Sequence, residues 1–328
     1  MIITRTPFRI SFVGGGSDLA AFYKKSKGAV ISTTINKYMY ISSHKFFEED
    51  KIRTKYSKTE TVNAVADLEH PILRTILNQF NIKGGLEISS IADVPGGTGM
   101  GSSSSFTVGS LHNLSAAKQQ YVTKEELAQM ACDVEINQLE EPIGKQDQYA
   151  AAYGGLNVYE FFPNGEVNVR PVFMDALAKQ ELESNLVMYY IGNQRSASKI
   201  LAEQSKNTTS SQDKFTSLQN MVNLVYDLES TLIKGELDDF GKIMHENWIL
   251  KQQLASGIAN PMISEVYDTA LKNGALGGKL LGAGGGGFML FYCPRNKQEN
   301  LKSALSKVRP FDFNFEEGGS QVIFHSNE

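Results

Sequence analysis

Residues 93–105 read Asp93-Val-Pro-Gly-Gly-Thr-Gly-Met-Gly-Ser-Ser-Ser-Ser105, so four glycines are followed by four serines. Glycines let backbone N–H groups approach an anion closely, and a helix start behind them adds free donors. Serine hydroxyls can donate to a phosphate or bind Mg²⁺. The stretch therefore predicts a polyphosphate site. The alternative is a flexible Gly/Ser linker, which the strand-like residues 86–91 before it and the helical, apolar residues 106–114 after it disfavour.

Three common phosphate loops do not fit this stretch or any other in the chain. A P-loop needs G-x-x-x-x-G-K-[ST], and residues 274–280 have the Gly-Lys pair without the spacing or the final hydroxyl. A dinucleotide fingerprint needs G-x-G-x-x-G, and residues 97–101 have a different glycine spacing. The H-R-D motif that a protein-kinase loop needs is absent, so the isolated tripeptide Asp239-Phe240-Gly241 does not indicate a protein kinase.

The bulk composition is that of a soluble globular chain. It has 328 residues, 41% hydrophobic and 21% charged, enough for two domains with their own cores. A net charge of -4 argues against a nucleic-acid partner. No apolar run approaches the roughly 18 residues of a membrane span. Cys132 and Cys293 form no disulfide or ligand pattern, and residues 1–10 resemble a strand and not a signal peptide. We expect a cytoplasmic protein with no membrane or nucleic-acid partner.

Periodicity predicts an α+β chain in two halves. A polar turn at 163–166 indicates the seam, which gives domains at 1–163 and 164–328. A capping box at Thr123 and an Asn260-Pro261 start predict two helix N-termini. The polar segment Glu203–Asp213 is expected to be a loop within an otherwise helical stretch at 198–274. Strands are expected at 2–13, 29–35, 38–43, 86–91, 156–162, 186–191, 287–292 and 321–324, and helices at 103–119 and 123–140.

Two acidic residues stand out. Glu135 shares one helix face with Leu127, Ala131 and Leu139, and a buried carboxylate is costly unless it is paired. It is either a structurally paired acid or a ligand of Mg²⁺, which takes few protein oxygens. Asp147 lies after the helix-stopping residues Pro142 and Gly144, so it is either an N-cap or an acceptor for a hydroxyl proton.

Two glycine runs indicate close backbone approach. Gly14–Gly16 ends the first strand, which carries Arg9, and Asp18 behind it is either an N-cap or an acceptor for sugar hydroxyls. Residues 282–287 contain five glycines, more than a turn needs, which favours approach to a ligand over a tight bend. Arg195 and Lys279 are weaker candidates for binding a second phosphate, and His245 and Trp248 are expected to be packing residues.

Three motifs in this order resemble the GHMP small-molecule kinases, and the resemblance covers nearly the whole chain. They are RTPFRISFVGGGSD at 5–18, PGGTGMGSS at 95–103 and LGAGGGGF at 281–288. The resemblance implies a two-domain fold, with an N-terminal domain similar to a ribosomal-protein domain and a C-terminal ferredoxin-like domain. ATP and a small-molecule acceptor would meet in the cleft between them.

The resemblance also assigns roles. Asp147 would be the base that deprotonates the acceptor hydroxyl, Arg9 would lie beside it and help to neutralise the transferring phosphoryl group, and Ser103 (or Ser102) and Glu135 would hold Mg²⁺. The residues implied to bind the ATP phosphates are Gly97, Gly99, Gly101, Ser102, Ser103 and Ser104. The residues expected to bind the acceptor are Gly15, Gly16, Ser17, Asp18, Arg195, Lys279, Gly284 and Gly285.

A departure from the galactokinase pattern reduces the number of possible acceptors. Galactokinases end the first motif with Gly-Glu-His-Thr-Asp, whereas this chain has Gly14-Gly-Gly-Ser-Asp18, which makes galactose a poor acceptor. The motifs look most similar to the branch that phosphorylates the anomeric hydroxyl of D-glycero-D-manno-heptose 7-phosphate, so we expect a small sugar phosphate as substrate and a monomer or homodimer. The alternatives are a kinase of a free sugar such as fucose and a non-catalytic sugar sensor.

Overall fold

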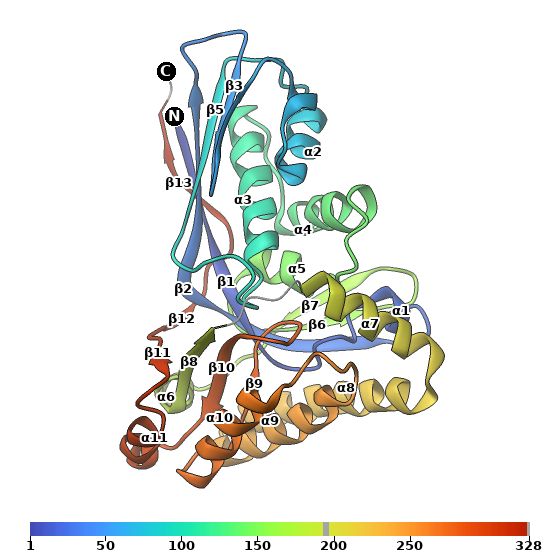
Figure 1. Cartoon of the computed structure of the whole chain (residues 1–328), viewed down its shortest axis with the longest axis vertical. Coiled ribbons are helices and arrows are strands. Elements are labelled where there is room, and N and C mark those ends of the chain that lie inside the picture. Colours follow the sequence, from blue (N-terminus) through green and yellow to red (C-terminus); the bar gives the residue numbers. More distant parts are fainter. Residues whose placement is uncertain (193–196, 327–328) are drawn as a thin grey trace.

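The computed structural model describes residues 1–192 and 197–326. A tall sheet is built on two long strands, β1 (Ile2–Val13) and β2 (Gly28–Lys45), which pair antiparallel. Its strand order is β13-β1-β2-β5-β3-β4, with β6 and β12 also pairing with β2 and β7 pairing with β6 (Figure 1). The remaining strands of this sheet are β3 (Ile52–Lys55), β4 (Thr59–Val62), β5 (Leu86–Ala92), β6 (Asn157–Phe161), β7 (Val167–Pro171), β12 (Phe315–Glu316) and β13 (Gln321–His325).

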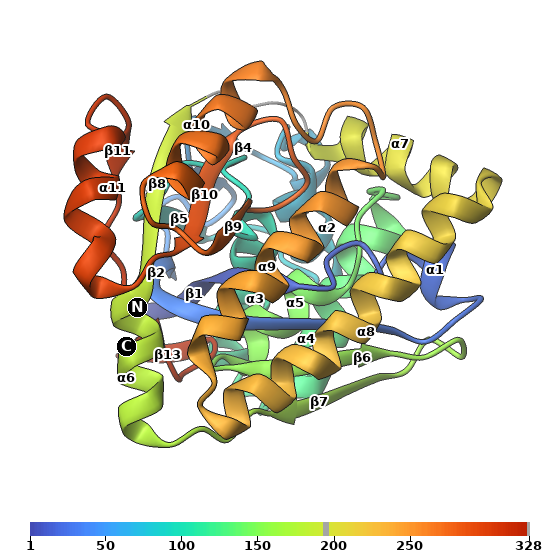
Figure 2. The same cartoon turned by 90° about the horizontal axis from the view of Figure 1, so that it is seen from below.

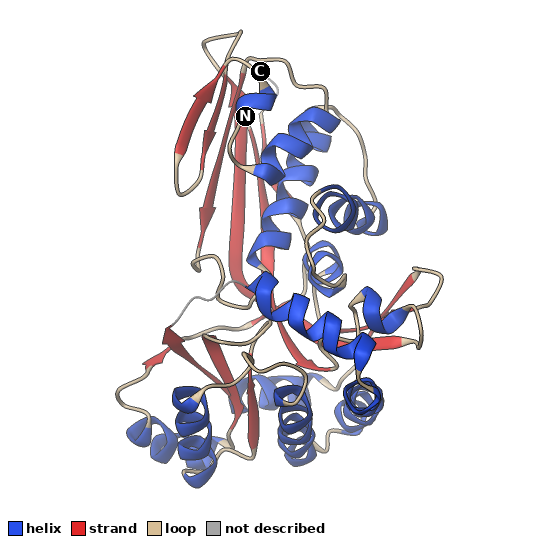
Figure 3. Ribbon diagram, turned by 45° about the vertical axis from the view of Figure 1, so that its right-hand side comes forward, coloured by secondary structure: helices blue, strands red, loops and turns tan. Residues whose placement is uncertain are grey.

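Helices cover one face of this sheet, as Figure 3 shows. The central one, α3 (Ser102–Ala117), is buried on almost every side, and it packs on β1 and β2. Its apolar residues therefore show little one-sided pattern, as expected of an internal helix. The helices around it are α2 (Pro71–Gln79), α4 (Lys124–Cys132) and α5 (Gln146–Tyr153), and the short helix α1 (Ala20–Tyr23) lies apart from it.

The second half packs a smaller sheet against long helices. Its strand order is β11-β8-β10-β9, all antiparallel. Helices α9 and α10 pack on β9, whereas α8 packs on α9 and on β1 and β2 of the first sheet (Figure 2). One apolar core runs from β1 into these helices, and the rings of Phe12 and Phe240 meet edge to face at 5.1 Å. The elements are α6 (Ala176–Asn185), β8 (Leu186–Gly192), α7 (Ala197–Ser210), α8 (Gln212–Lys234), α9 (Leu237–Gln252), α10 (Pro261–Lys272), β9 (Gly277–Leu280), β10 (Gly287–Tyr292), α11 (Gln298–Ala304) and β11 (Arg309–Pro310).

The chain passes between the two halves more than once, so a single division point does not separate them. The turn at 163–166 is a hairpin that joins β6 to β7, and both strands belong to the first sheet. Near the end of the chain β12 and β13 return to pair with β2 and β1. Three strands of the first sheet, β7, β12 and β13, therefore lie beyond residue 163 in the sequence. The domain division at residue 163 stays a prediction. Both termini consequently lie at the same end of the tall sheet (Figure 1).

Most of the predicted elements are present, and one is corrected. The capping box at Thr123 and the Asn260 N-cap both form. The segment Glu203–Asp213 is mainly helical, since α7 continues to Ser210. One face of α7 is buried and consists of Ile200, Gln204 and Thr208. Tertiary packing of this face stabilises the helix although its sequence is polar. Within the described residues no helix combines the length and apolar character needed to cross a bilayer.

Candidate active site

A cavity of about 300 Å³ lies between the two halves of the molecule. The end of β1, the loop before α3, the start of α5, helix α9 and the segment after β9 all contribute to its wall. The predicted site residues that line it are Arg9, Gly15, Gly16, Asp18, Gly97, Gly99, Gly101, Ser102, Ser103, Ser104, Glu135, Asp147, Lys279 and Gly284. Residues that the sequence analysis took from five separate segments thus meet at one place.

The glycine-serine stretch forms a loop that ends in the N-terminus of α3. Gly97, Gly99 and Gly101 have φ angles of +75°, +85° and +74°, in the left-handed region that favours glycine. Gly101 is the N-cap of α3, and no side chain caps the free N–H groups of its first turn. Free N–H donors at the positive end of a long helix, on a cavity wall, suit a phosphate.

Arg9 and Asp147 form a bidentate pair beside this loop. Arg9 Nε donates to Asp147 Oδ1 and Arg9 Nη2 donates to Oδ2, both at 2.8 Å, while Nη1 donates to Gly99 O at 2.6 Å. The Arg9 side chain is buried and that of Asp147 is one-quarter exposed. A Cβ atom added to Gly101 would lie 3.3 Å from Asp147 Oδ2. The carboxylate is therefore held by two charge-assisted bonds, against the phosphate loop and open to the cavity.

Glu135 is buried beside the start of α3. Its Oε1 accepts from Ser103 Oγ at 2.6 Å, and its Oε2 accepts from Ser104 Oγ at 2.8 Å and from Gln148 Nε2 at 2.7 Å. Burial raises the pKa of Glu135, and these hydrogen bonds oppose the rise. The residue lies on a π-helical turn, Asp133–Gln138, where the expected helix 123–140 widens. Such turns are common at functional sites.

The residues around Glu135 fit Mg²⁺. The Ser103 hydroxyl oxygen and Glu135 Oε1 lie 2.6 Å apart, and both residues line the cavity. Both atoms are hard oxygen ligands of the kind that Mg²⁺ prefers. Within the described part of the chain, no group of three or more His, Cys, Asp or Glu side chains could hold a metal ion. A small ligand set is consistent with an ion that keeps water and substrate phosphates in its shell.

Asp18 lines the cavity and accepts hydrogen bonds from the backbone of two segments. Its Oδ1 accepts from Gly16 N at 2.9 Å and its Oδ2 from Gln146 N at 3.3 Å. Burial, followed by the nearby charge of Asp147, raises the pKa of Asp18. The contact with Gln146 ties the first glycine run to the start of α5, which carries Asp147.

Comparison with known proteins identifies the family. Residues 62–155 match the family model of the GHMP kinases N terminal domain, and residues 228–310 match that of the GHMP kinases C terminal, together more than half of the chain. The chain belongs to the GHMP kinases. It is therefore a kinase with the two-domain fold of that family, and it uses ATP.

Among relatives of this GHMP kinase, D-glycero-alpha-D-manno-heptose 7-phosphate kinase of Campylobacter jejuni is 29% identical, over 97% of each chain. The bifunctional fucokinase/GDP-fucose pyrophosphorylase of Arabidopsis thaliana is 26% identical over 93% of this chain and 31% of its own length. The crystal structure of a D-glycero-D-manno-heptose 1-phosphate kinase from Bacteroides thetaiotaomicron superposes with a TM-score of 0.81, at 24% identity and full coverage of both chains. That likeness supports the fold.

Two expected substrate residues of the kinase, Ser17 and Gly285, do not line the cavity. The Ser17 hydroxyl donates to Gly14 O and Ala29 O and accepts from Ala29 N, so it ties the backbone together, which corrects its expected role. Gly285 does not line the cavity, and its N–H donates to Ile258 O at 3.1 Å. Arg195 lies outside the described residues.

Sequence reasoning missed several polar side chains at the cavity, of which Lys251 and Gln148 matter most. Lys251 lines its wall and Gln148 holds Glu135. Lys251 follows the buried Met244 and Trp248 at helical spacing, so an ammonium group falls on an apolar stripe. That is the same signal that singled out Glu135. His245 and Trp248 pack against Tyr267, which agrees with their expected role.

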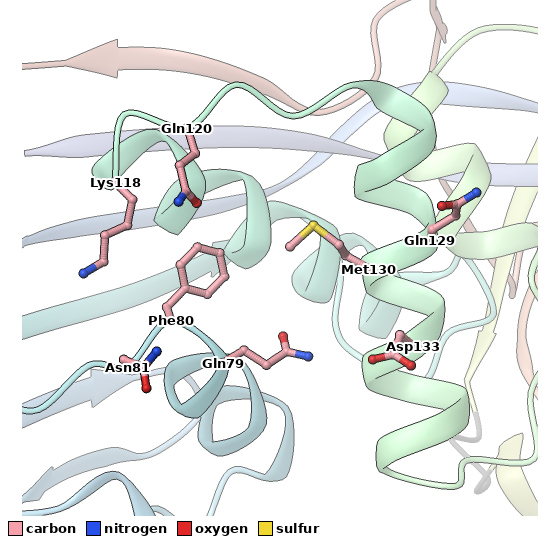
Figure 4. Close-up of a pocket in the computed structure, with 8 residues that line it drawn as sticks. All are labelled: Gln79, Phe80, Asn81, Lys118, Gln120, Gln129, Met130 and Asp133. Atoms are coloured by element: carbon pink, nitrogen blue, oxygen red, sulfur yellow. The ribbon is translucent and has the colours of Figure 1, made fainter.

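A second hollow, of about 670 Å³, lies away from this kinase site (Figure 4). It is open to solvent between the ends of α2 and α3 and the helix α4. Half of its lining residues are amides, with Phe80 and Met130 between them, and it includes none of the predicted site residues. Asp133 there accepts from Asn137 and Gln138, so its oxygens are engaged within its own helix.

Proposed function

We propose that this GHMP kinase transfers the γ-phosphoryl group of ATP to the anomeric hydroxyl of D-glycero-D-manno-heptose 7-phosphate, giving the 1,7-bisphosphate. The relative from Campylobacter jejuni, similar over 97% of both chains, supports this acceptor class. The missing Glu-His pair of the galactokinase motif also argues against galactose. The reaction consumes ATP, which fits the expected cytoplasmic location.

The observation that carries the proposal is the Arg9–Asp147 pair beside the phosphate loop. A phosphoryl transfer needs an acceptor for the hydroxyl proton, next to the position of the γ-phosphate. Asp147 is held against Gly101 and open to the cavity, which supports that position.

In the proposed reaction the anomeric oxygen attacks the γ-phosphorus, its proton passes to Asp147, and the bond from phosphorus to the bridging oxygen of ADP breaks. Arg9 faces the negative charge that builds on the transferring group. Ser103 and Glu135 would hold Mg²⁺, which neutralises charge on the nucleotide phosphates when it is bound. An anomeric hydroxyl is more acidic than an ordinary alcohol, so a carboxylate is a sufficient base.

A free-sugar kinase that acts on fucose is the second candidate. The fucokinase relative is similar over 93% of this chain, although the chain spans only about a third of that protein. A non-catalytic sensor is disfavoured, because Asp147, Glu135 and Ser103 all line the same cavity. A non-catalytic sensor would not need a base and a metal ligand in the same cavity.

The test is Mg-ATP-dependent ADP release by the purified protein with four acceptors. These are D-glycero-D-manno-heptose 7-phosphate, the free heptose, fucose and galactose. We expect turnover with the heptose phosphate and at least about 100-fold lower kcat/KM with the others, because a site built around a charged group rejects an analogue that lacks it. Faster turnover of fucose or free heptose would replace the proposed acceptor, and silence on all four would favour the sensor.

A further inference from the structure

Two lysines have their ammonium groups buried in the cavity wall. Lys251, from α9, is 5% exposed, and Lys279, from β9, is 3% exposed. Both line the cavity that contains Arg9 and Asp147. Within the described residues neither ammonium has a carboxylate within 4 Å, whereas Arg9 is paired with Asp147. The wall therefore holds two lysine amino groups with no carboxylate in contact.

Neutral groups position both ammonium groups. Lys251 Nζ donates to Gly15 O at 3.2 Å and to Gln204 Oε1 at 3.1 Å. Lys279 Nζ donates to Ser11 O at 2.8 Å and to Ser11 Oγ at 3.3 Å. An ammonium has three donor hydrogens, so each lysine keeps one for a further acceptor.

Gln204 adds a third donor to this group. It is fully buried on α7, and its Nε2 has no hydrogen-bond partner in the described structure. A Cβ atom added to Gly16 would lie 2.1 Å from Gln204 Nε2 and 3.4 Å from Lys251 Nζ, so both groups border the first glycine run. A buried amide without an acceptor is costly, which suggests that a ligand oxygen satisfies it.

The electrostatics of the cavity wall also favour an anion. Burial lowers the pKa of Lys251 to about 8, against an opposing effect of Asp18. Burial, followed by the charges of Lys251 and Arg9, lowers the pKa of Lys279 well below its usual value. Buried ammonium groups that repel each other are stabilised by an anion between them.

We propose that Lys251 and Lys279, with Gln204, bind the phosphate group that the acceptor already carries. This assignment rests on the proposed function, because it needs an acceptor with two ends, a hydroxyl at Asp147 and a phosphate at the lysines. It makes Lys251 the residue that separates phosphorylated from free sugars. Lys251 contacts Gly15, in the first glycine run, and Gln204. The ATP phosphates are expected to bind to a different segment, the loop at 97–104.

The first test is Lys251→Met, which keeps the side-chain length and its apolar stem but removes the charge. We expect KM for the heptose phosphate to rise about 10- to 100-fold, the range of one lost charged hydrogen bond. KM for free heptose and for Mg-ATP should stay within about two-fold, since these molecules have no group at that seat. The matched control is Lys242→Met, an exposed lysine on the same helix. A rise in the KM of Mg-ATP with none for the acceptor would assign the lysines to the nucleotide and overturn the proposal.

The second variant guards against a fold defect in the first. Gln204→Glu keeps the size of the side chain and sets a carboxylate beside Lys251, where it would neutralise the charge from within. We expect the same loss of preference for the phosphorylated sugar. A variant that folds normally and keeps the wild-type preference would contradict the proposal.

A third experiment separates this proposal from the proposed function. Calorimetry with inorganic phosphate is run on the protein saturated with Mg²⁺ and a non-hydrolysable ATP analogue, so the nucleotide phosphate positions are filled. We expect binding to the wild type and to Lys242→Met, and at least about 10-fold weaker binding to Lys251→Met and Gln204→Glu. That result supports the seat even if the heptose phosphate is not turned over. Equal binding by all four proteins, or none by the wild type, overturns the seat.

Discussion

At the scale of single residues, three of the carboxylates that line the cavity lie in different environments. Glu135 is buried and accepts three hydrogen bonds from side chains, and Asp18 is buried and accepts two from backbone N–H groups. Asp147 alone combines an arginine partner with exposure to the cavity. Proton acceptance needs access to the substrate, so Asp147 is the carboxylate best suited to be the base.

Asp147→Asn should remove the base while leaving the nucleotide site intact. We expect kcat to fall by about 10²- to 10⁴-fold, with KM for Mg-ATP within about three-fold, because the amide still accepts one bond from Arg9. The measurement is steady-state ADP release together with nucleotide binding by calorimetry. Asp133→Asn is the control, since Asp133 lies outside the cavity and its side chain accepts from Asn137 and Gln138 within its own helix. Full activity in Asp147→Asn would remove this residue from the chemistry.

At the scale of elements, the two glycine-rich segments pack on each other. A Cβ atom at Gly99 would lie 2.4 Å from Leu281 O, and one at Gly282 would lie 2.5 Å from the Gly99 Cα. Gly287 is similarly close to Thr98 O, and Gly284 to the backbone of Ile258. The run at 282–287 was expected to approach a ligand. Gly282 and Gly284 do line the cavity, but the run is glycine-rich mainly because backbone meets backbone there.

Gly99→Ala should therefore disturb the phosphate loop through its support. Its φ of +85° is unfavourable for alanine, and the Cβ atom would meet Leu281 O. We expect a loss of about 2–3 kcal/mol of unfolding free energy, and a KM for ATP raised by about 10-fold or more through the displaced loop. Gly96→Ala is the control, because a Cβ atom at Gly96 meets nothing within 4 Å. Urea unfolding and ATP titration measure both effects, and equal behaviour of the two variants would contradict this account.

At the scale of the whole molecule, polar links tie the first sheet to the long helix α8. Glu160 of β6 accepts from Lys27 and from Tyr226 of α8, both at 2.9 Å. Arg170 of β7 forms a bidentate pair with Glu229 of α8. Burial opposes the charge of Glu160, but hydrogen bonds from Lys27, Asn168 and Tyr226 outweigh it and lower the pKa of Glu160 to about 2. These links hold the two halves around the cavity.

Glu160→Gln should lower stability in a pH-dependent way. Because the folded pKa lies below the ordinary value, the ionised carboxylate stabilises the fold above about pH 4.5, and this contribution declines as pH falls toward 2. A shift of this size corresponds to about 3 kcal/mol, and the exposure of Lys27 to solvent reduces the expected effect at pH 7 to about 1 kcal/mol. Unfolding of wild type and variant between pH 7 and pH 3 should show a gap that narrows with acid. A gap independent of pH would mean that charge is not its cause, and Glu166→Gln in the exposed adjoining turn is the control.

The sequence by itself determined the local structures. The capping box at Thr123, the Asn260-Pro261 start and the glycines with positive φ depend on nearest neighbours, so their patterns can be interpreted without a fold. The three motifs were also sufficient to indicate the GHMP kinases. The helix at 203–210 was missed, because its polar residues are stabilised by packing that no local pattern records.

Only the tertiary structure decided which residues meet. Arg9 and Asp147 are 138 positions apart, and Lys279 and Ser11 are 268 apart, so their contacts depend on how the halves pack. Ser17 followed a promising glycine run, yet its hydroxyl is used within the backbone. Lys251 stood on an apolar stripe, and only the tertiary structure shows that it is buried on the cavity wall with no carboxylate of the described residues in contact. Local conformation follows from adjacent residues, whereas a binding site is made by long-range packing, which the linear order does not specify.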